Sequence, residues 1–521
     1  MGGEVRGNYC TMNPLANGGL TLSNGNLDIS RATASWKNAR GTIAYPASGK
    51  WYWEYTCSSV SDSTNGPKVG IVVSQASLDD PGGDAFGWAY LGYNATIWNN
   101  GVPSAYGATY TNGDVIGVAF DADAGTLVFY KNGASQGTAF SSLSSGPYFP
   151  VLGIYGTGSG SANFGQRAFA YPVSGFKALV DTNLPTPVVA KPNTVMDVVL
   201  YTGNGSTQTI SGLAFSPDFV WYKSRVSAVF NHGLFDIVRG AQNFLASNST
   251  AAELGSIAGV SAFNSDGFTL GSDAGGNTST ASMVAWAWDA GTSTVTNTAG
   301  SITSQVRANV SAGFSVVTYT APSSGAWTTG HGLGVAPQFI ITKSRSNAYS
   351  WGTYHVSIGN TGRLDLNTTN AVTTTQNAAW NNTSPTSTVF SVGSDWAGSG
   401  ITYVAYCFAP VVGYSSFGSY VGNGSSDGVF VYTGFRPRWI MLKRSDSTES
   451  WIIIDAVRDA YNLSANNLFP NLSIAEQGSA SLDILSNGFK LRSTTTGGNV
   501  SGGTYIFAAF AESPFQYARA R

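Results

Sequence analysis

Residues 215–225 read FSPDFVWYKSR, and this pattern occurs twice more along the chain. Residues 335–345 read VAPQFIITKSR, and residues 435–445 read FRPRWIMLKRS. In each copy a proline is followed by an aromatic residue two positions later, by an alternating apolar strand, and by a lysine six positions after the proline. These prolines are Pro217, Pro337 and Pro437, and the lysines are Lys223, Lys343 and Lys443.

Two further landmarks keep a nearly constant distance from each proline and extend the similarity into a repeated unit. A tyrosine precedes the proline, and the aromatic end of an apolar strand follows it much further along the chain. Solenoid repeats are about 20 to 50 residues long, so we interpret these longer units as three related small β domains at 196–291, 292–412 and 413–521. The landmarks are Tyr201, Tyr319 and Tyr420, and then Trp288, Phe408 and Phe510.

The joins between the repeats differ in length. The join from Trp288 to Tyr319 is more than twice as long as the join from Phe408 to Tyr420. We therefore expect the second and third repeats to be held rigidly together. In the longer join, residues 293–306 read STVTNTAGSITSQV, whose alternation predicts a hairpin.

The composition favours a β protein with a neutral polar surface. Only 10% of the 521 residues are charged, while 13% are aromatic and 64 are glycine. Disordered chains are typically highly charged and poor in aromatic residues, so we expect a folded chain. Its polarity comes from Ser, Thr, Asn and Gly, which suit turns and solvated strand faces.

Charge and cysteine usage argue against several classes of partner and cofactor. There are 26 basic and 28 acidic residues, with no basic cluster, so we do not expect nucleic acid as a partner. Cys10, Cys57 and Cys407 are too few and too scattered for a disulfide framework or a zinc site. We expect no cofactor and no metal ion.

The first residues, MGGEVRGNYC, contain no apolar stretch of the secretory type, and no run of about 18 apolar residues follows. We therefore expect a chain made in a cytoplasm, without membrane insertion.

Residues 1–171 predict an antiparallel sandwich of short strands. Residues 49–58, GKWYWEYTCS, alternate as a half-buried strand with Trp51, Trp53, Tyr55 and Cys57 on its inner face. Turns are expected at residues 121–125, DADAG, and at the Asn-Gly pairs that begin at positions 100, 112 and 132.

This segment resembles a SPRY domain. The resemblance rests on GKWYWEY, on VGIVVS at 69–74, on GDVIGVAFDADAGTLVFYKNG from residue 113, and on YFPVLGIYG at 148–156. It covers roughly residues 1–170 and implies a bent sandwich of two sheets whose loops bind partner surfaces. The family supplies no catalytic residues, so the resemblance implies a binding module.

Residues 172–195 include Pro172, Pro185, Pro187 and Pro192. Proline fixes φ and removes a hydrogen-bond donor, so we interpret this segment as an extended linker. The alternative is that part of it packs along the edge of the sandwich.

The repeats resemble uncharacterised repeats of structural proteins in tailed phages. Residues 299–320, AGSITSQVRANVSAGFSVVTYT, and residues 265–272, SDGFTLGS, carry this resemblance. It implies no activity, but it favours a virion fibre, tail or capsid-surface component.

Catalytic motifs receive little support. His232, His331 and His355 lie in no serine, cysteine or metal motif, and we interpret them as structural. Glycosidases need two carboxylates, and the visible pairs are Asp79 with Asp80 and Asp121 with Asp123. We interpret both pairs as turn residues, because the first lies in a Pro-Gly turn and the second fits a hairpin. A calcium loop starting at Asp121 is not expected, because its twelfth position is Asn132 rather than a bidentate acid.

Aromatic residues separate into a core group and a loop group. Trp286 and Trp288 lie on one face of a strand, with mostly apolar equivalents in the other repeats, which predicts a core. Residues 79–110 instead interleave aromatic residues with Gly, Asn and Pro, so binding and core roles both remain open there. The candidate binding residues are Trp88, Tyr90, Tyr93, Trp98, Asn99, Tyr106 and Tyr110.

The sequence thus predicts an all-β chain and a non-enzymatic phage virion protein. We expect a tail fibre or adhesin that contacts a host-surface glycan or protein through the SPRY-like loops, with other virion proteins as partners. The alternatives are a capsid or tail decoration protein without a receptor, and a polysaccharide-degrading tailspike. Wide neutral surfaces and the phage analogy favour a homo-oligomer, expected as a trimer.

Overall fold

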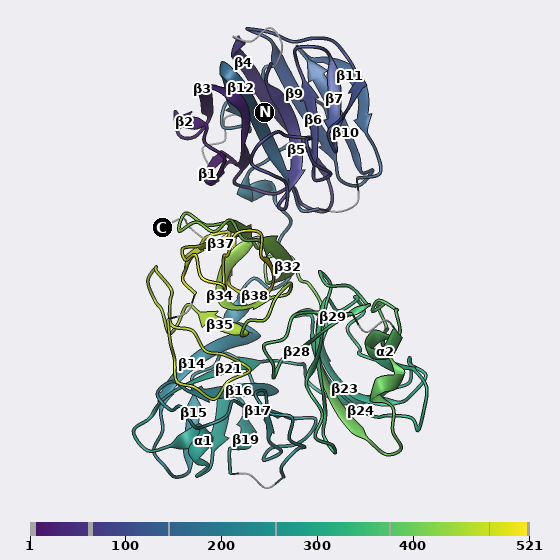
Figure 1. Ribbon diagram of the computed structural model, residues 1–521, viewed down its shortest axis with the longest axis vertical. Helices are drawn as coiled ribbons and strands as arrows, with labels where there is room; N and C mark the ends of the chain where they lie inside the picture. Colours follow the sequence, from purple (N-terminus) through teal and green to yellow (C-terminus); the bar gives the residue numbers. More distant parts are fainter. Residues whose placement is uncertain are drawn as a thin grey trace. The chain divides into compact units, whose positions relative to one another are not determined.

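The protein is described by a computed structural model at residues 7–60, 66–143, 146–255, 258–374, 377–478 and 480–517. The chain is nearly all β, which confirms the predicted fold class. It forms two compact units, Met1–Thr186 and Pro187–Arg521 (Figure 1). No described helix is long and apolar enough to span a membrane.

The first unit is a bent sandwich whose central strands run in the order β11-β10-β9-β4-β12-β5-β6-β7-β8. The first half of β12 pairs with β5 and its second half with β4, so one long strand joins the two layers. The strands are β1 (Met12–Asn17), β2 (Thr21–Ser23), β3 (Asp28–Gly41), β4 (Lys50–Val60), β5 (Lys68–Val73), β6 (Gly87–Leu91), β7 (Thr96–Asn99), β8 (Val102–Ala105), β9 (Val115–Asp121), β10 (Thr126–Lys131), β11 (Ala134–Phe140), β12 (Tyr148–Asn163) and β13 (Lys177–Ala178).

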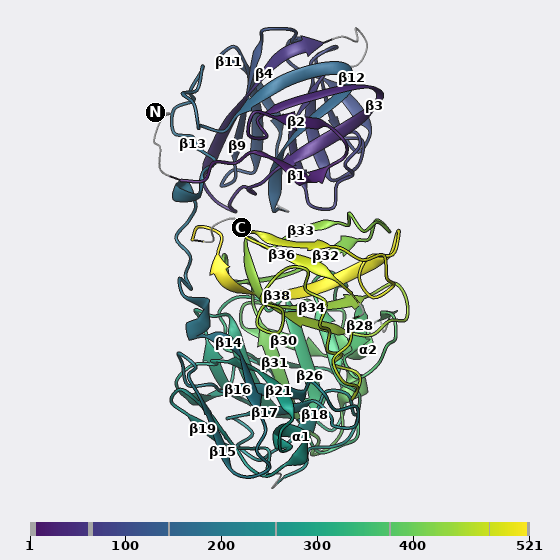
Figure 2. The same cartoon turned by 90° about the vertical axis from the view of Figure 1, so that its left-hand side faces the viewer.

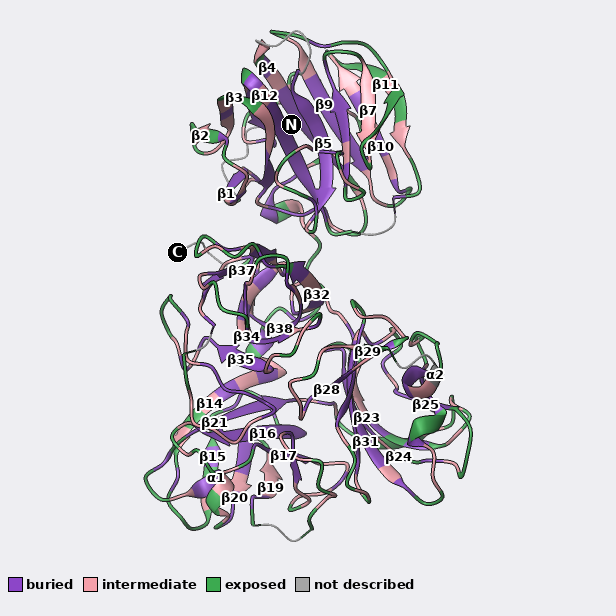
Figure 3. Cartoon of the chain, in the orientation of Figure 1, coloured by how far each residue is buried: buried purple, intermediate pink, exposed green. Residues whose placement is uncertain are grey.

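Tight turns lie where the sequence predicts them. Asn100 and Gly101 both have positive φ between β7 and β8, and so do Asn132 and Gly133 between β10 and β11. Asn-Gly is favoured in such turns because both positions need the left-handed region. Figure 3 shows β4, β5 and β9 coloured mainly as buried, whereas β7 and β11 carry half-buried and exposed residues.

Strand β4 is buried on both faces, so the prediction of a half-buried strand is wrong. The reason is a cover of residues that follow β12. The carboxylate of Glu54 accepts hydrogen bonds from the backbone N–H groups of Ala170 (2.8 Å) and Tyr171 (2.7 Å). The Tyr52 hydroxyl donates to the carbonyl oxygen of Tyr171 at 2.8 Å.

The first half of the expected linker at 172–195 belongs to this cover. Strand β13 pairs in parallel with β4 at Trp51 and Tyr52. It is followed by the buried Leu179 and Val180 and by a short turn, η1 (Asp181–Asn183). The chain passes to the second unit after Thr186.

The second unit contains three main sheets of the same strand order, one from each repeat. They are β14-β21-β16-β17, β24-β31-β26-β27 and β32-β38-β34-β35. The aromatic residue two positions after each proline pairs with the aromatic end of the last strand, as Phe219 with Trp288 and Phe339 with Phe408. In the third repeat Trp439 pairs with Phe510. The three repeats therefore share one strand register.

Smaller elements complete each repeat. In the third repeat, β33 and β36 lie over β34 and β38 (Figure 2). The first repeat, with the turn that precedes it, contains η2 (Pro192–Thr194), β14 (Met196–Thr202), β15 (Gln208–Ser211), β16 (Phe219–Ser224), β17 (Gly233–Asp236), β18 (Leu245–Ala246), β19 (Val260–Asn264), β20 (Gly267–Leu270), α1 (Ala274–Asn277) and β21 (Ser282–Trp288). The second repeat contains β22 (Thr294–Asn297), β23 (Ser304–Asn309), β24 (Phe314–Thr320), β25 (Trp327–Gly330), β26 (Phe339–Ser344), β27 (Gly352–His355), β28 (Gly362–Asp365), β29 (Thr373–Thr374), α2 (Asn377–Trp380), β30 (Val389–Val392), η3 (Ser394–Trp396) and β31 (Thr402–Phe408). The third repeat contains β32 (Ser415–Val421), β33 (Phe430–Tyr432), β34 (Phe435–Arg444), β35 (Ile452–Asp455), β36 (Leu482–Leu485), β37 (Gly488–Leu491) and β38 (Thr504–Pro514).

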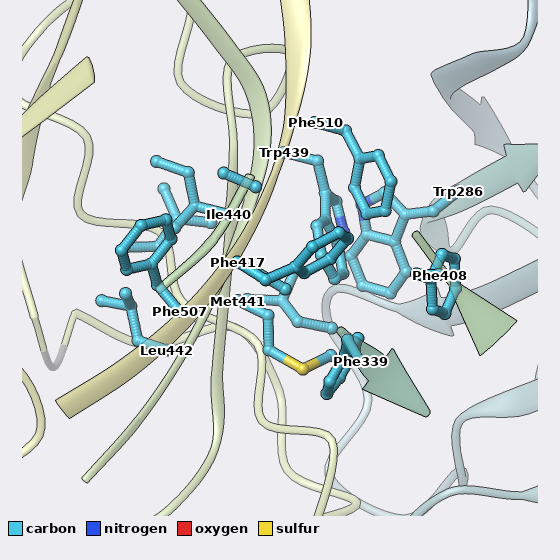
Figure 4. Close-up of a cluster of buried hydrophobic side chains, with 14 of the residues drawn as sticks. Trp286, Phe339, Phe408, Phe417, Trp439, Ile440, Met441, Leu442, Phe507 and Phe510 are labelled. Atoms are coloured by element: carbon cyan, nitrogen blue, oxygen red, sulfur yellow. The ribbon is translucent and has the colours of Figure 1, made fainter. Parts of the chain in front are cut away.

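One aromatic core is shared by all three repeats. Figure 4 shows side chains of several strands meeting there, including Phe339, Phe408, Trp439 and Phe510. Ring centroids of Trp288 and Trp439 lie 5.6 Å apart, and those of Phe408 and Phe510 lie 5.5 Å apart. These residues come from three repeats, so the related modules form one compact unit. The core position of Trp286 and Trp288 is confirmed.

The centre of this core holds a cavity of about 10 Å³, walled by apolar and aromatic side chains from all three repeats. Ligand pockets are typically about 300 to 1,000 Å³. The centre of the second unit is therefore packing, and a binding surface has to be sought elsewhere.

Polar contacts close the repeats into a ring. The Tyr406 hydroxyl donates to Asp236 of the first repeat (2.9 Å), and the Trp286 indole N–H donates to Asp455 of the third (3.0 Å). Between the second and third repeats, His355 takes the position that Asp236 and Asp455 hold in the other two repeats. Its Nε2 lies 3.0 Å from the carbonyl oxygen of Phe507. Each repeat thus contacts both others through equivalent strands.

Two of these seams also carry partly buried ion pairs. Arg345 of the second repeat pairs with Glu253 of the first at 2.7 Å. Arg225 of the first repeat pairs with Glu476 of the third at 2.8 Å. The arginines hold the pKa of both glutamates below its usual range against the opposing effect of burial.

The repeated lysines are buried beside the shared core. Lys223 Nζ donates to the carbonyl oxygens of Ser224 (3.0 Å) and Ser227 (3.2 Å). Lys343 makes the same two contacts with Ser344 (2.7 Å) and Asn347 (3.2 Å). Burial lowers the pKa of these amines, and of Lys443, to about 8.

The hairpin predicted at residues 293–306 is confirmed. Strands β22 and β23 pair antiparallel, and β23 then pairs with β24 along the outer edge of the second main sheet. The equivalent strands β14 and β32 lie at the end of their sheets.

We expect Trp288→Ala to lower the free energy of unfolding of the second unit by about 3 to 5 kcal/mol, because it removes a ring shared by three sheets. Guanidinium unfolding of the full chain would measure this loss. Trp88→Ala, in the first unit, serves as the control and should leave the second unit unchanged. A loss below about 1 kcal/mol for Trp288→Ala would contradict the shared core.

Stability of the second unit should rise between pH 8 and pH 9.5. In this range the unfolded amines, with a pKa of 10.5, bind more protons than the buried ones, so the free energy of unfolding increases with pH. Each lysine adds up to about 1.4 kcal/mol per pH unit. Unfolding curves of wild type and Lys343→Met across this range give the test: the variant should show a shallower rise, and an equal slope would rule the mechanism out.

Candidate binding surface of the N-terminal unit

The outer face of the sandwich carries aromatic residues around a buried lysine. Along β5, Val69 and Ile71 point into the core, so Lys68 points to the opposite face. Lys68 pairs across the sheet with Gly153 of β12 and with Leu91 of β6. Strands β3 and β7 flank these neighbours and supply Trp36 and Trp98.

We define the Lys68 cluster as Trp36, Lys68, Asp80, Trp98 and Tyr155. The ammonium of Lys68 lies 4.0 Å from the ring centroid of Trp98 and 4.7 Å from that of Trp36. Its Nζ pairs with Oδ1 of Asp80 at 2.5 Å, and the rings of Trp36 and Tyr155 lie 5.7 Å apart. Trp36, Trp98 and Tyr155 are half-buried, so each presents part of its ring to solvent.

Desolvation dominates the electrostatics of the ion pair. The side chain of Lys68 is only 1% exposed, whereas that of Asp80 is 28% exposed. Burial lowers the pKa of Lys68 and raises the pKa of Asp80, and in both groups their mutual attraction opposes this effect. Two indole faces and one carboxylate therefore compensate a cation that water does not reach.

The loop between β5 and β6 is fixed over this face. Asn38 Nδ2 donates to the carbonyl oxygens of Ser77 (2.9 Å) and Asp79 (3.0 Å). Arg40 donates to the carbonyl oxygen of Ser74 at 2.7 Å, and Lys37 pairs with Asp79. These contacts hold the loop rigidly beside the Lys68 cluster.

Two residues of the candidate loop, Tyr90 and Tyr110, lie in the core. They are 0% and 3% exposed. The ring of Tyr90 lies within 5.2 Å of Tyr106, Tyr110 and Phe129, and the Tyr110 hydroxyl donates to the carbonyl oxygen of Pro67 at 2.6 Å. They pack the sandwich and present little ring surface to a ligand.

Trp88 and Tyr106 lie at the margin of this core and are half-buried. Trp88 packs edge-on against Tyr148 with a centroid distance of 5.4 Å. The Tyr106 hydroxyl donates to the carbonyl oxygen of Gly137 at 2.6 Å.

The remaining candidates, Tyr93, Trp98 and Asn99, have different surroundings. Trp98 faces the Lys68 cluster, and its indole N–H donates to the Thr96 hydroxyl at 2.9 Å. Asn99, the next residue along the strand, donates to the carbonyl oxygen of Gly87 at 2.8 Å. Tyr93 lies on the β6–β7 turn and is 43% exposed. The structure therefore brings only Trp98 of the seven into the cluster.

The sequence analysis did not find Trp36, Lys68 or Tyr155. One signal was available, because Trp36, Asn38 and Arg40 are two residues apart in β3, so the tryptophan shares a strand face with two polar residues. Their proximity to Trp98 depends on the pairing of β3, β12, β5, β6 and β7, which no local pattern encodes.

Groups considered for catalysis are occupied in structural contacts. Asp79 and Asp80 pair with lysines. Asp121 accepts from the backbone N–H groups of Asp123 (3.1 Å) and Ala124 (3.0 Å), which is the expected turn. The three histidines and three cysteines are buried, and burial raises the pKa of each thiol. Within the described ranges, no group of three His, Cys, Asp or Glu side chains is placed to hold a metal ion.

Two family models match the chain. One is described as a domain of unknown function (DUF7483) and covers residues 191–514. The other is the SPRY domain and covers residues 50–167. The N-terminal SPRY domain expected from the sequence is therefore confirmed.

The chain spans less than a third of the length of the curated relatives it matches. E3 ubiquitin-protein ligase RKP of Arabidopsis thaliana is 33% identical over 139 residues, which are 25% of this chain and 10% of that protein. Ran-binding protein 9 of Xenopus laevis is 31% identical over 167 residues, 30% of each protein. The SPRY domain of human HERC1 is similar at 18% identity with a TM-score of 0.27, covering 29% of this chain and 96% of that chain.

These relatives correct the expected function. They are a plant and an amphibian protein, and neither is a phage protein. The expectation of a phage tail fibre or adhesin is therefore wrong, together with its decoration-protein and tailspike alternatives. The resemblance of the repeats to phage proteins receives no support.

We expect Asp80→Asn to destabilise the sandwich by about 3 kcal/mol, because it leaves the buried Lys68 ammonium without a counter-charge. Hydrogen exchange of β5 amides in the full chain would report the local free energy of opening. The double variant Lys68→Met/Asp80→Asn should recover most of the loss, since it removes both charges. A double variant as unstable as the single one would show that the ion pair is not the cause.

Proposed function

The chain belongs to the family described as a domain of unknown function (DUF7483), and on that premise we propose that it is a non-catalytic binding protein whose SPRY domain recognises a partner protein. The observation that carries this proposal is the Lys68 cluster, which presents two tryptophans and a tyrosine on one rigid face. Tryptophan and tyrosine dominate the energetics of protein interfaces.

The rigidity of the cluster favours recognition. Trp36, Trp98 and Tyr155 lie on strands rather than on a free loop, and Lys68 fixes the two indoles from below. A partner therefore loses little binding free energy to ordering these side chains. The neighbouring Asp79 and Lys37 add a polar rim to the aromatic surface.

The relatives support a binding role rather than a particular activity. One is named for binding Ran and another as a ubiquitin ligase, and the match to this chain covers only a small share of either protein. What they have in common with this chain is the SPRY segment. We therefore assign the contact to the SPRY domain and leave ligase activity and Ran binding with those proteins.

The charge of the chain argues against nucleic acid as a partner. The described basic residues are mostly paired with carboxylates or backbone oxygens, and the chain has a net charge of −2, so the proposal includes no nucleic acid. The homo-oligomer stays a prediction that rests on the neutral surface. The phage analogy no longer supports a trimer.

Peptide selection gives the experimental test. We expect peptides selected on the full-length protein from a random display library to bind wild type and to lose affinity by at least about 30-fold with Trp98→Ala or Trp36→Ala, as for an interface hot spot. Titration of each selected peptide by fluorescence anisotropy measures the affinity.

Tyr93→Ala is the matched control, because it removes a more exposed aromatic side chain outside the cluster. It should leave affinity within about 3-fold of wild type, below the usual hot-spot threshold. If Tyr93→Ala abolishes binding while Trp36→Ala and Trp98→Ala retain it, the loop rather than the Lys68 cluster is the site.

A further inference from the structure

The outer edge of the main sheet has different surroundings in each of the three repeats. Strands β14, β24 and β32 are equivalent, since Tyr201, Tyr319 and Tyr420 hold the same register against the last strand of each repeat. Each of these strands uses one edge to pair with that last strand. The fate of the other edge can therefore be compared within one molecule.

In the second repeat, a strand covers this edge. Strand β23 runs antiparallel to β24, from Ser304 opposite Tyr319 to Asn309 opposite Phe314. The side chain of Val306 at its centre is buried. The molecule itself thus shows that this edge accepts an extended antiparallel strand.

In the first repeat, side chains block the edge. The backbone N–H of Val198 donates to Oδ1 of its neighbour Asp197 at 2.8 Å. Arg438 of the third repeat binds the same carboxylate oxygen at 2.7 Å. A charged group that caps an edge N–H in this way prevents strand addition.

In the third repeat, the edge stays open beyond its first residue. Ser415 N–H donates to the carbonyl oxygen of Val411 at 2.9 Å, but within the described ranges no strand pairs with the outer edge of β32. The strand contains no charged residue and no proline, and its register with β38 runs without a bulge. These are the devices that normally protect an edge, and β32 lacks them.

The register identifies the free backbone groups. Gly422 N–H donates to the carbonyl oxygen of Gly503, so Gly422 and alternate residues before it face the last strand. Phe417, Ser419 and Val421 therefore direct their backbone N–H and C=O groups away from β38. The side chain of Val421 is 52% exposed.

We propose that the outer edge of β32 binds an extended segment of a partner protein as an added antiparallel strand. Strand β23 is the template for this segment. Val306 of β23 lies opposite Val317, and the residue equivalent to Val317 is Gly418. The partner strand therefore carries an apolar residue at that point, where it contacts the ring of Phe507, which covers Gly418.

Glycine at this position favours a partner strand over a second copy of β32. Antiparallel self-pairing centred on Ser419 would place serine opposite serine and Gly418 opposite Tyr420, whose ring is already buried against Tyr505 of its own repeat. Such a pair gains backbone hydrogen bonds but little apolar contact. Backbone bonds give affinity in strand addition, whereas alternate side chains give specificity.

A peptide with the sequence of residues 302–311, ITSQVRANVS, is the probe. We expect the labelled peptide to bind the full-length protein in fluorescence anisotropy titrations. Ser419→Pro should weaken binding at least tenfold, because proline removes an outward N–H without removing a bond to β38. Ser419→Ala keeps that N–H and should bind as wild type does.

A change in the peptide tests the same bonds without altering the protein. The peptide methylated at the backbone nitrogens of Gln305 and Arg307, which would face Ser419 and Phe417, should bind wild type at least tenfold more weakly. The proposal would be overturned if the unmodified peptide did not bind wild type. It would also be overturned if the methylated peptide bound wild type as tightly as the unmodified peptide does and Ser419→Pro bound the unmodified peptide as tightly as wild type does. If light scattering instead shows a dimer that Ser419→Pro abolishes, and the peptide does not bind, the edge belongs to a second copy.

Discussion

The packing of aromatic rings between three sheets is the constraint on which the second unit depends. Each main sheet buries one face against the common core, where Phe219 stacks on Tyr406 of the next repeat at 4.3 Å. The other face of the first and second main sheets packs within its own repeat. A single repeat would therefore expose an aromatic face that only the other two can cover, and this explains why the proline, the lysine and the aromatic strand ends recur together.

This arrangement also assigns functions to different parts of the chain. The core of the second unit is closed, and its polar contacts serve the seams between repeats, so recognition is left to surfaces. The SPRY domain offers such a surface in the Lys68 cluster, where a buried cation holds two indoles in place. The open edge of β32 offers a second one, of a different chemical kind. A chain with both surfaces would join two partners.

Much of the fold could be predicted from the sequence, and much less of the site. Periodicity and Asn-Gly turns identified strands and hairpins, because alternation and turn conformation are local properties. The three landmarks predicted a common register, which Phe219, Phe339 and Trp439 confirm. That the repeats share one core was not visible in the sequence, since an apolar strand face looks the same whichever sheet covers it.

The Lys68 cluster was missed for a similar reason, because Trp36, Lys68 and Trp98 come together only through the pairing of five strands. Two aromatic residues of the loop that the sequence favoured, Tyr90 and Tyr110, instead lie in the core of the sandwich. The function inferred from phage-like phrases was wrong because neutral, Gly-rich and Thr-rich strands are common to many β proteins.

The measurement that most directly tests the shared core is native-state hydrogen exchange of the full-length chain in increasing denaturant, read separately for β16, β26 and β34. Each of these strands places aromatic or apolar side chains in the common core. The account predicts that their amides exchange through one opening event with the same free energy and the same denaturant dependence, because no repeat keeps its core when another unfolds. Separate opening free energies for the three strands, with one repeat exchanging while the other two stay protected, would contradict it.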